Sequence, residues 1–416
     1  MGARTLDIAV AGCGPGGLAA ALLLHRDGHR VTLFEQFDVP RPIGSGLMLQ
    51  PTGLAVLDAL GLGAQIRELG APIDRLFGRA APSGRVVLDV RFAALRPDLQ
   101  GLAIHRGALF QTLFDAVKTE GIALETGRAI AGWANGVARR HLRFDNETTA
   151  GPFDLVVNAL GTRSPLAPET NGDLAYGALW ATLDWPEHAS FDIRALEQRY
   201  RRASHMVGVL PVGRIPGDGR TKTAFFWSLR ARDLADWHSD GLDRWKETAI
   251  SLWPETASLL EQITDPHQLT FARYAHRTLA NPVEAGLVHL GDAWHSASPQ
   301  LGQGANMALL DAAALADALH HIADISEALH AYRRLRQSHV RLYQALSWMF
   351  TPVYQSDSRI LPVLRDYLVG PLVKLPPIPQ FLAAMVAGLL GWPLRRMQVR
   401  STASTNARML VSSTAR

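Results

Sequence analysis

Short apolar runs separated by glycine-rich turns open the chain and return late in it. Residues 6–11 form a run typical of a buried parallel strand, residues 18–26 an apolar helix, and residues 31–35 a second strand. Runs of the same type lie at residues 153–159 and 286–290. The pattern predicts a parallel sheet that begins with one βαβ unit and is completed only late in the sequence.

Between these runs the pattern changes to one that predicts a second, mixed or antiparallel sheet. Alternating segments lie on either side of a Pro-Ser-Gly turn at residues 82–84, and further strand-like segments lie at 176–183, 206–210 and 223–229. Helices are predicted at 105–119, 241–252, 255–264, 306–322 and 325–350.

These patterns predict an α/β protein in which one lobe is inserted into the other. The predicted limits are 1–72, 100–175 and 276–350 for the first lobe, 73–99 and 176–275 for the second, and 351–416 for a C-terminal helical segment and tail.

Composition narrows the class of protein. A chain of 416 residues with 47% hydrophobic and 19% charged residues is globular and long enough for two lobes. The net charge of +4 is spread without long basic blocks, so nucleic-acid binding is not indicated. Cys13 is the only cysteine, which excludes an internal disulfide and favours a cytoplasmic location.

The C-terminal region contains a second apolar feature. Residues 381–394 are apolar and are followed by Arg395 and Arg396, as in helices that lie at the surface of an anionic membrane. Packing against the first lobe explains the same pattern. Both interpretations remain open, and no apolar stretch reaches the roughly 20 residues that would span a bilayer.

A glycine-rich turn after the first predicted strand carries the first chemical signal. It reads Gly12-Cys13-Gly14-Pro15-Gly16-Gly17, and the second strand ends in Glu35. Strand, turn, helix and acidic residue together are typical of a dinucleotide site, where the helix N-terminus binds phosphates and the carboxylate binds a ribose. A carboxylate there disfavours a 2'-phosphate, so FAD or NAD is predicted over NADP. A purely structural glycine turn is the alternative.

The second signal is the segment 290–306, between a predicted strand and a long helix. Asp292 ends the strand with an acceptor for sugar or ribityl hydroxyls, while Gly302 and Gly304 leave N–H groups available at the helix start. Such groups stabilise negative charge on the pyrimidine edge of a reduced flavin. An ordinary loop with Asn306 as helix cap is the alternative.

Together, these motifs resemble those of the group A flavin-dependent monooxygenases. Further matches are Arg41, the segment 44–47 with Gly46, Arg106 at a helix start, and Pro299. The resemblance implies a Rossmann-like FAD-binding domain of the GR2 type with an inserted mixed-sheet substrate domain. It also implies that Arg106 contacts the cofactor, that residues 44–47 run along the isoalloxazine ring, and that Pro299 lies beside it.

The resemblance implies a reaction as well. NADH or NADPH reduces FAD, O2 adds at flavin C4a, and the resulting hydroperoxide hydroxylates or epoxidises a small, largely hydrophobic aromatic or fused-ring substrate. An oxidase or dehydrogenase of the same fold is one alternative, and a non-catalytic redox sensor is another. One departure affects electron supply: Leu160 stands where the family has Asp, so a partner that supplies reduced flavin is a further alternative.

The resemblance also places the substrate between the flavin and the second sheet. The predicted contacts are Leu47, Leu49, Leu210, Phe225 and Trp227. Phe225 and Trp227 instead fill the core of the second lobe if the strand register is shifted by one residue. His295 and Pro299 are candidates for positioning roles, with a structural role as the alternative for His295. No residue is assigned as a catalytic base, and no metal site is predicted because His320 and His321 lack accompanying Cys or carboxylate ligands.

Overall fold

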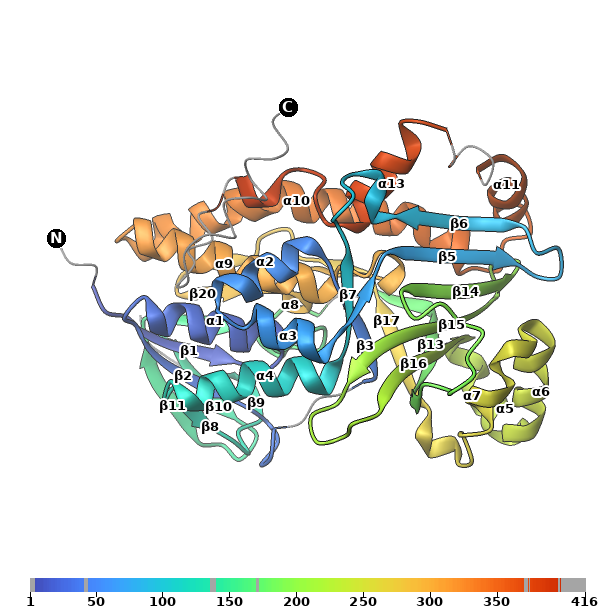
Figure 1. The fold of residues 1–416 in the computed structure, drawn as a ribbon. Helices are drawn as coiled ribbons and strands as arrows, with labels where there is room; N and C mark the ends of the chain where they lie inside the picture. Colours follow the sequence, from blue (N-terminus) through green and yellow to red (C-terminus); the bar gives the residue numbers. More distant parts are fainter. Residues whose placement is uncertain are drawn as a thin grey trace.

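The computed structural model describes residues 4–40, 44–134, 140–169, 172–369, 373, 375–395 and 397. Figure 1 shows two lobes side by side, with a long helix, α10 (Ile325–Tyr354), running along the top of the molecule. The first lobe contains a mostly parallel sheet with helices, and the second contains a larger mixed sheet. The predicted α/β class is confirmed.

The first lobe is built on a six-stranded sheet with the order β19-β20-β12-β1-β2-β8. Its strands are β1 (Asp7–Ala11), β2 (Arg30–Phe34), β8 (Ala123–Glu125), β12 (Leu155–Asn158), β19 (Val283–Glu284) and β20 (Leu287–His289). Only β19 is antiparallel to its neighbour. Since both faces of the sheet are covered, the central strands are buried and mostly apolar, as the pattern predicted, with Asn158 and His289 as buried polar exceptions at strand ends.

Helices cover one face of this sheet and a small sheet covers the other. The helices are α1 (Pro15–Arg26), α2 (Pro51–Ala59), α3 (Gly63–Leu69), α4 (Arg106–Thr119) and α9 (Gly304–His321). The small sheet has the order β11-β10-β9 and comprises β9 (Ile130–Trp133), β10 (Arg140–Phe144) and β11 (Thr149–Phe153). Leu142 and Phe144 pack there against Ala9, Phe34 and Val156.

A second three-stranded sheet connects the lobes and was not predicted. It has the order β3-β7-β4, with β3 (Gly46–Leu49), β7 (Gly101–His105) and β4 (Ala71–Ile73). The strand β3 leads directly into α2, and β7 leads directly into α4. Both helix starts are therefore held at the boundary between the lobes.

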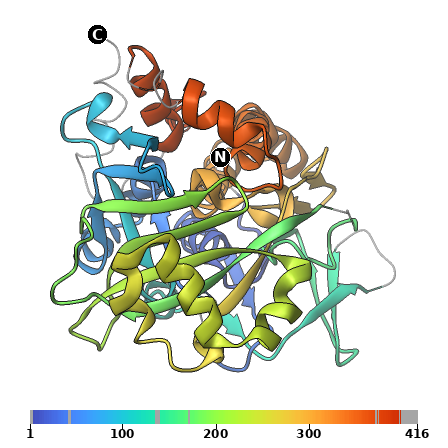
Figure 2. The same cartoon turned by 90° about the vertical axis from the view of Figure 1, so that its right-hand side faces the viewer.

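The second lobe contains a seven-stranded sheet with the order β17-β13-β16-β15-β14-β5-β6. Its strands are β5 (Arg75–Ala80), β6 (Val86–Arg91), β13 (Asp173–Asp184), β14 (Ala195–Arg201), β15 (His205–Arg214), β16 (Thr221–Arg230) and β17 (Thr270–Ala275). The strands from 75–91 and from 173–275 thus share one sheet. Figure 2 shows helices covering one face of it. These are α5 (Leu234–Asp240), α6 (Leu242–Leu252) and α7 (Ala257–Leu260), the last shorter than the predicted 255–264.

The remaining elements follow α10. They are α11 (Leu361–Leu364), the π-helix η6 (Arg365–Val369), α13 (Ile378–Val386) and the 3-10 helix η7 (Pro393–Arg395), while the short helix α8 (Asp292–His295) lies between β20 and α9. The helix α13 packs on β6 and on the 3-10 helix η1 (Phe92–Ala94), while η6 also packs on β6. Among the described helices, none is long and apolar enough to cross a membrane.

Candidate active site

The glycine turn between β1 and α1 requires glycine at two positions for steric reasons. Gly12 has a φ of +102°, and a Cβ built on it lies 2.8 Å from the carbonyl oxygen of Ala159. A Cβ on Gly17 lies 2.0 Å from the carbonyl oxygen of Gly12. The loop backbone therefore packs so closely on Ala159 and on the start of α1 that a side chain at either position would clash.

The other glycines of the motif serve different purposes. A Cβ built on Gly16 lies 3.0 Å from that of Ala308, so Gly16 allows α1 to pack on α9. Gly14 is the N-cap of α1 and would meet no atom within 4 Å. Pro15 occupies the first helical position, where its missing N–H costs nothing. The start of α1 thus presents bare N–H groups beside open space, which is the geometry a pyrophosphate needs.

Glu35 lies just beyond β2 and faces this turn. Its carboxylate accepts hydrogen bonds from the N–H groups of Cys13 and Phe37, both at 3.2 Å. These contacts hold the carboxylate at the end of the sheet where a ribose would lie. Burial, followed by the adjacent Glu35, raises the pKa of the Cys13 thiol far above its usual value. Cys13 is therefore a packing residue and not a nucleophile.

Asp292 is the first residue of α8. Its side chain is exposed to solvent, yet burial raises its pKa, with His295 and Arg106 acting in the opposite direction. Both observations hold when a carboxylate lines an open hollow with protein on most sides. The exposed Asp292 carboxylate and Arg106 thus line one hollow, which we refer to as the recess. The charge of Arg106 also acts on Tyr274 of β17, whose pKa is raised by burial.

Arg106 is positioned by its neighbours at the start of α4. The His105 Nδ1 accepts a hydrogen bond from the N–H of Gly107 at 3.0 Å, and the His105 Nε2 lies 3.2 Å from Thr182 Oγ1 of β13. A Cβ built on Gly44, whose φ is +99°, lies 2.9 Å from the Cδ of Arg106. The residues 44 and 106 are thus in contact, whereas Arg41 lies outside the described residues.

His295 does not face this recess, and its predicted contact with substrate or flavin is corrected. Its side chain is fully buried, and its Nε2 donates to Asp311 Oδ2 at 2.7 Å. Asp311 also accepts from the N–H of Gly291 at 2.9 Å and from Arg336 Nε at 2.7 Å. Although burial acts to raise it, His295 and Arg336 together hold the pKa of Asp311 below its usual value.

This buried network extends from the Asp292 loop to the C-terminal segment. Arg336 donates from a terminal nitrogen to His339 Nδ1 at 3.1 Å, and His339 Nε2 donates to the carbonyl oxygen of Gly388 at 3.2 Å. We refer to His295, Asp311, Arg336 and His339 as the buried network. It fixes the backbone at Gly291, one residue before Asp292, so His295 is a structural residue.

The start of α9 is fixed by the side chain of Asn306, and a contact of Asn306 with the cofactor stays a prediction. The Asn306 side chain is completely buried. Its Oδ1 accepts from the N–H of Gln50 at 2.7 Å, and its Nδ2 donates to the carbonyl oxygens of Met48 and Gly302 at 3.0 and 2.9 Å. The side-chain amide thus joins β3 to α9, and a contact of Asn306 with the cofactor would involve its backbone N–H in the first turn of α9.

The predicted bare N–H of Gly302 is corrected, because it donates to the carbonyl oxygen of Pro299 at 2.9 Å. Gly302 adopts the left-handed conformation with a φ of +61°, and a Cβ on Gly304 would meet no atom within 4 Å. Pro299 is exposed at the start of the 3-10 helix η5 (Pro299–Leu301). The geometry matches a flavin edge at the N-terminus of α9, and the role of Pro299 stays a prediction.

The segment that departs from the family is held in place without a carboxylate. Asn158 Oδ1 accepts from the N–H of Leu160 at 3.2 Å and from Ser164 Oγ at 2.9 Å. From the other side, Arg277 donates to the carbonyl oxygens of Thr162 at 2.6 Å and Pro168 at 3.1 Å. Neither contact was anticipated from the sequence, because both partners lie outside the motif.

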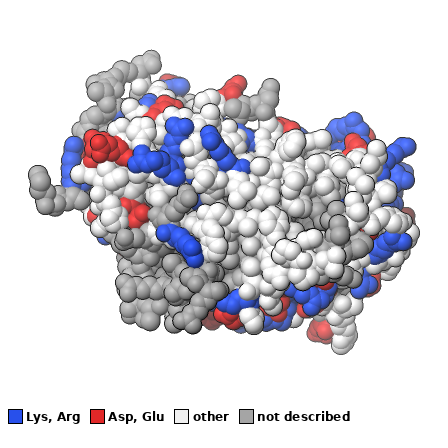
Figure 3. Space-filling view, turned by 90° about the horizontal axis from the view of Figure 1, so that it is seen from above, with Lys and Arg blue, Asp and Glu red and all other residues white. Residues whose placement is uncertain are grey.

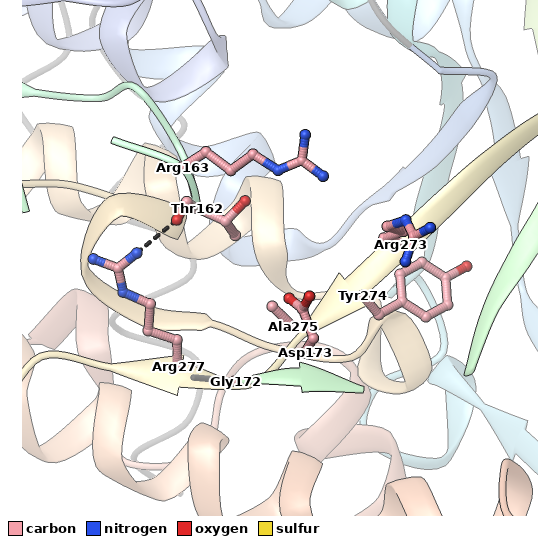
Figure 4. Close-up of a pocket in the computed structure, with 8 residues that line it drawn as sticks. All are labelled: Thr162, Arg163, Gly172, Asp173, Arg273, Tyr274, Ala275 and Arg277. Carbon is pink, nitrogen blue, oxygen red and sulfur yellow. Dashed lines mark hydrogen bonds between the residues drawn. The ribbon is translucent and has the colours of Figure 1, made fainter. Parts of the chain in front are cut away.

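Beside this segment lies a pocket shown in Figure 4. It is lined by Thr162, Arg163, Gly172, Asp173, Arg273, Tyr274, Ala275 and Arg277. Arg163 and Thr162 come from the loop after β12, and Arg273 and Tyr274 come from β17. Three guanidinium groups and one carboxylate give the pocket a positive balance.

The face of the second sheet toward the first lobe differs from the predicted one. Phe225 and Trp227 point away from it, into the core under α5–α7, where both rings lie edge-on to Trp245. Their predicted contact with substrate is therefore corrected. Leu210 lies on the opposite face and packs with the first lobe.

Of the two β3 residues predicted to contact substrate, only one is accessible. Leu47 is half-buried, whereas Leu49 is completely buried in the core of the first lobe, which corrects its predicted role. Gly46 on the same strand faces the second sheet, since a Cβ there would lie 2.4 Å from Val212 Cγ1. Glycine at 46 is thus required by packing between the lobes.

The aromatic residues that do face the first lobe were missed. Trp180 donates from Nε1 to the hydroxyl of Tyr274 at 3.0 Å, and its ring lies 4.6 Å from that of Phe226. Trp180 pairs with Phe226 across β13 and β16, so both side chains lie on the same face. We refer to Trp180, Phe226 and Tyr274 as the aromatic wall. Successive side chains of a strand point to opposite faces, so either Phe225 and Trp227 or Phe226 had to face the first lobe. Only the pairing register of β16 shows that it is Phe226.

Comparison with known proteins identifies the family. The profile of the FAD binding domain family matches residues 5–126 and 157–345, which contain the glycine turn at 12–17 and the segment 290–306. The chain belongs to this family. The predicted resemblance to the group A flavin monooxygenases is confirmed, as are the assignment as an enzyme and FAD as the cofactor.

Individual relatives support the same grouping. The chain is 26% identical over 392 residues to 6-hydroxynicotinate 3-monooxygenase of Pseudomonas fluorescens, covering 88% of this chain and 98% of the relative. It is 26% identical over 381 residues to asperlicin C monooxygenase of Petromyces alliaceus, covering 82% and 79%. The fold is similar to that of 2-methyl-3-hydroxypyridine-5-carboxylic acid oxygenase, with a TM-score of 0.77, 19% identity, and 96% and 100% of the two chains covered.

Proposed function

We propose that this FAD enzyme inserts one atom of O2 into a small, largely hydrophobic aromatic or fused-ring substrate that binds between the Asp292 loop and the aromatic wall. When bound, FAD supplies the electrons and the site at which O2 is activated. The overall balance is NAD(P)H, a proton, O2 and substrate giving NAD(P)+, water and the oxygenated product. One observation carries the proposal: the charge of Arg106 acts on both Asp292 and Tyr274, which links the cofactor loop to the aromatic wall.

The protein contributes positioning and exclusion of water to this reaction. The bare N–H groups at the starts of α1 and α9 bind the pyrophosphate and the pyrimidine edge, respectively. Trp180 and Tyr274 are only partly buried and offer an indole ring and a phenol hydroxyl, a surface suited to a planar substrate with few polar groups, while the buried Phe226 packs beside Trp180. Relatives named for 6-hydroxynicotinate and asperlicin C act on ring compounds, which agrees with this surface.

The arginine pocket supports direct reduction by NADH or NADPH. A pyridine nucleotide carries an anionic pyrophosphate, and Arg163, Arg273 and Arg277 provide guanidinium groups for it. The Nε of Arg277 is buried and has no hydrogen-bond partner among the described residues. Because Asn158 and Arg277 hold the Leu160 segment, the loss of the family carboxylate leaves the pocket wall intact.

An anaerobic single-turnover experiment tests the reaction itself. The holoenzyme is reduced, mixed with 18O2 and a panel of aromatic compounds, and the products are analysed by mass spectrometry. Incorporation of one 18O atom into one compound is the expected result. The proposal would be overturned if no compound of the panel gained oxygen while hydrogen peroxide formed in stoichiometric amount and one compound was dehydrogenated. That outcome would identify an oxidase.

Electron supply is tested separately by bleaching of the flavin absorbance with NADH or NADPH. Arg163→Ala is expected to raise KM for the nucleotide roughly 10-fold, because one charge-assisted contact is lost. The re-oxidation rate of chemically reduced enzyme should not change. Arg232→Ala, which removes an exposed arginine from the second lobe, is the matched control. Absence of bleaching with either nucleotide, combined with 18O incorporation by chemically reduced enzyme, would favour a partner that supplies reduced flavin.

A further inference from the structure

The exposed large hydrophobic side chains of this protein are concentrated in one part of the chain. Of thirteen such residues among those described, ten lie between residues 348 and 392. They include Trp348, Ile360 and Tyr367, exposed by 73%, 70% and 61%, and Phe381 and Trp392, each exposed by 47%. Large side chains exposed to this extent within one segment of 45 residues mark an interaction surface.

These residues lie on neighbouring elements at the top of the molecule in Figure 1. Trp348 is near the end of α10, Ile360 precedes α11, Tyr367 lies in η6, and Phe381 lies in α13. The elements are connected through packing: α11 contacts α10 and η6, and both η6 and α13 lie on β6. We refer to this surface as the C-terminal apolar face. Figure 3 looks down on it and shows a broad area without charged side chains, with Lys and Arg at its edges.

The charge of this part of the chain is opposite to that of the remainder. Residues 328–416 contain twelve Lys and Arg but only two Asp and no Glu, whereas residues 1–327 contain 30 Lys and Arg and 36 Asp and Glu. Both Asp residues are paired within the protein, Asp366 with Arg365 Nε at 2.7 Å and Asp357 with Arg230 and Tyr176. The small net charge of the whole chain therefore conceals a strongly basic C-terminal part.

Several cationic groups lie next to the exposed aromatic rings. Arg85 stacks on Tyr367 at 4.0 Å from the ring centroid, and Arg395 stacks on Trp392 at 4.3 Å. Arg341 and Arg359 are also exposed, Arg341 on the same stripe of α10 as Trp348. Tryptophan and tyrosine rings with arginine beside them are the combination found at the headgroup level of membranes.

We propose that the C-terminal apolar face docks this enzyme onto the surface of an anionic phospholipid membrane. A bilayer with negative headgroups complements both properties of the face, since its interior accepts the apolar rings and its headgroups neutralise the arginines. A second copy of the chain is disfavoured, because a two-fold interface would bring two strongly basic segments together. Since no described helix is long and apolar enough to span a bilayer, the contact is peripheral.

Vesicle flotation with the FAD-loaded enzyme tests this proposal. Vesicles of phosphatidylcholine alone are compared with vesicles containing phosphatidylcholine and phosphatidylglycerol at about 3:1, whose negative surface attracts basic groups. The anionic vesicles should bind the enzyme at least about 10-fold more tightly, and high salt should weaken that binding. Equal binding to both vesicles, or binding to neither, would overturn the proposal.

Substitutions locate the contact. The double variant Trp348→Ser, Trp392→Ser should reduce binding to anionic vesicles about 10-fold or more, because it removes two interfacial anchors. Ile193→Ser, which changes an exposed side chain of the second lobe, is the matched control and should bind normally. Flavin absorbance per chain verifies that each variant is folded.

Charge reversal provides an independent variant and distinguishes the lipid from a protein partner. Arg341→Glu, Arg359→Glu should abolish the preference for anionic vesicles while leaving the tryptophan anchors intact. Sedimentation of the free enzyme is measured in parallel. A dimer that the tryptophan substitutions dissociate, together with unchanged vesicle binding, would show that the face serves self-association and that the proposal is wrong.

Discussion

The two lobes bury different kinds of core. The second lobe fills the space between its sheet and α5–α7 with aromatic rings, among them Phe225, Trp227 and Trp245. The first lobe packs α1 against α9 through glycine and alanine, and places the charged buried network directly behind the Asp292 loop. The comparison indicates that the second lobe is stabilised by burial of large apolar side chains. The first lobe also contains buried polar groups that fix the backbone around its cofactor.

Among the substitutions that test this difference, Asp311→Ala is expected to have the largest effect on stability. Removing the carboxylate leaves Arg336 buried without its charge partner and releases the N–H of Gly291, so the free energy of unfolding should fall by about 3–5 kcal/mol. Denaturant unfolding measures the stability, and FAD titration of the folded protein should show weaker binding. Unchanged FAD affinity in a destabilised variant would mean that the network supports the lobe and not the cofactor loop.

Acid should affect the first lobe through its buried histidines. Burial, with Arg336 adding to it, lowers the pKa of His339 to about 3, and burial lowers that of His289 to about 4. Both values lie below that of an unfolded histidine, so the stabilising contribution is complete above about pH 6.5 and decreases as the unfolded chain takes up protons below it. For His339, about 2–3 kcal/mol should be lost between pH 7 and pH 4.5.

Unfolding at a series of pH values tests this slope, with His339→Gln as the comparison. The amide of glutamine does not titrate, so the variant should be less stable at pH 7 but should lose less stability on acidification. A slope identical to that of the wild type would show that other groups cause the acid sensitivity.

Two neighbouring residues of β16 allow a matched comparison of the faces of the second sheet. Phe225→Leu should cost about 1–2 kcal/mol of stability through loss of core volume, with substrate kinetics unchanged. Phe226→Leu changes the aromatic wall by the same atoms and should raise KM for substrate several-fold. If the two variants gave the same kinetics, the aromatic wall would not be the substrate surface.

The smallest effect is expected from Tyr274→Phe. The hydroxyl accepts a hydrogen bond from Trp180 Nε1, and its loss should cost about 0.5–1.5 kcal/mol of substrate affinity or stability. Steady-state KM and thermal unfolding separate the two, and a several-fold rise in KM without a change in melting temperature would assign the hydroxyl to orientation of the wall. A change in melting temperature alone would assign it to packing.

The features read correctly from the sequence are those fixed over short distances along the chain. The spacing of Gly12, Gly14 and Gly17 after an apolar run determines the turn locally, and Asp292 occupies a similarly local transition from strand to helix. Steric limits at a left-handed or closely packed glycine act within a few residues. Sequence alone is therefore sufficient to recognise them.

The errors concern contacts between distant segments. Phe225 and Phe226 are equally apolar neighbours, and only pairing with β13 and β15 decides which one faces the site. His295 carries a group that suits a ligand, but Asp311, remote in sequence, occupies that group. Arg277 likewise supports the Leu160 segment from 115 residues away. Patterns of residue type cannot reveal such partners.

The order of strands in the first sheet has a consequence for synthesis of the chain. The strand β1 pairs with β2 and β12, and β12 pairs in turn with β20. When 150 residues have been synthesised, β1 can pair with β2, but β12, its partner on the other edge, is still missing. After β12 has been synthesised, its own second edge stays unpaired until residues 287–289 are complete. Open apolar strand edges of this kind promote association between unfinished chains. Slow translation or expression at low temperature should therefore raise the yield of soluble protein without changing the stability of the finished enzyme.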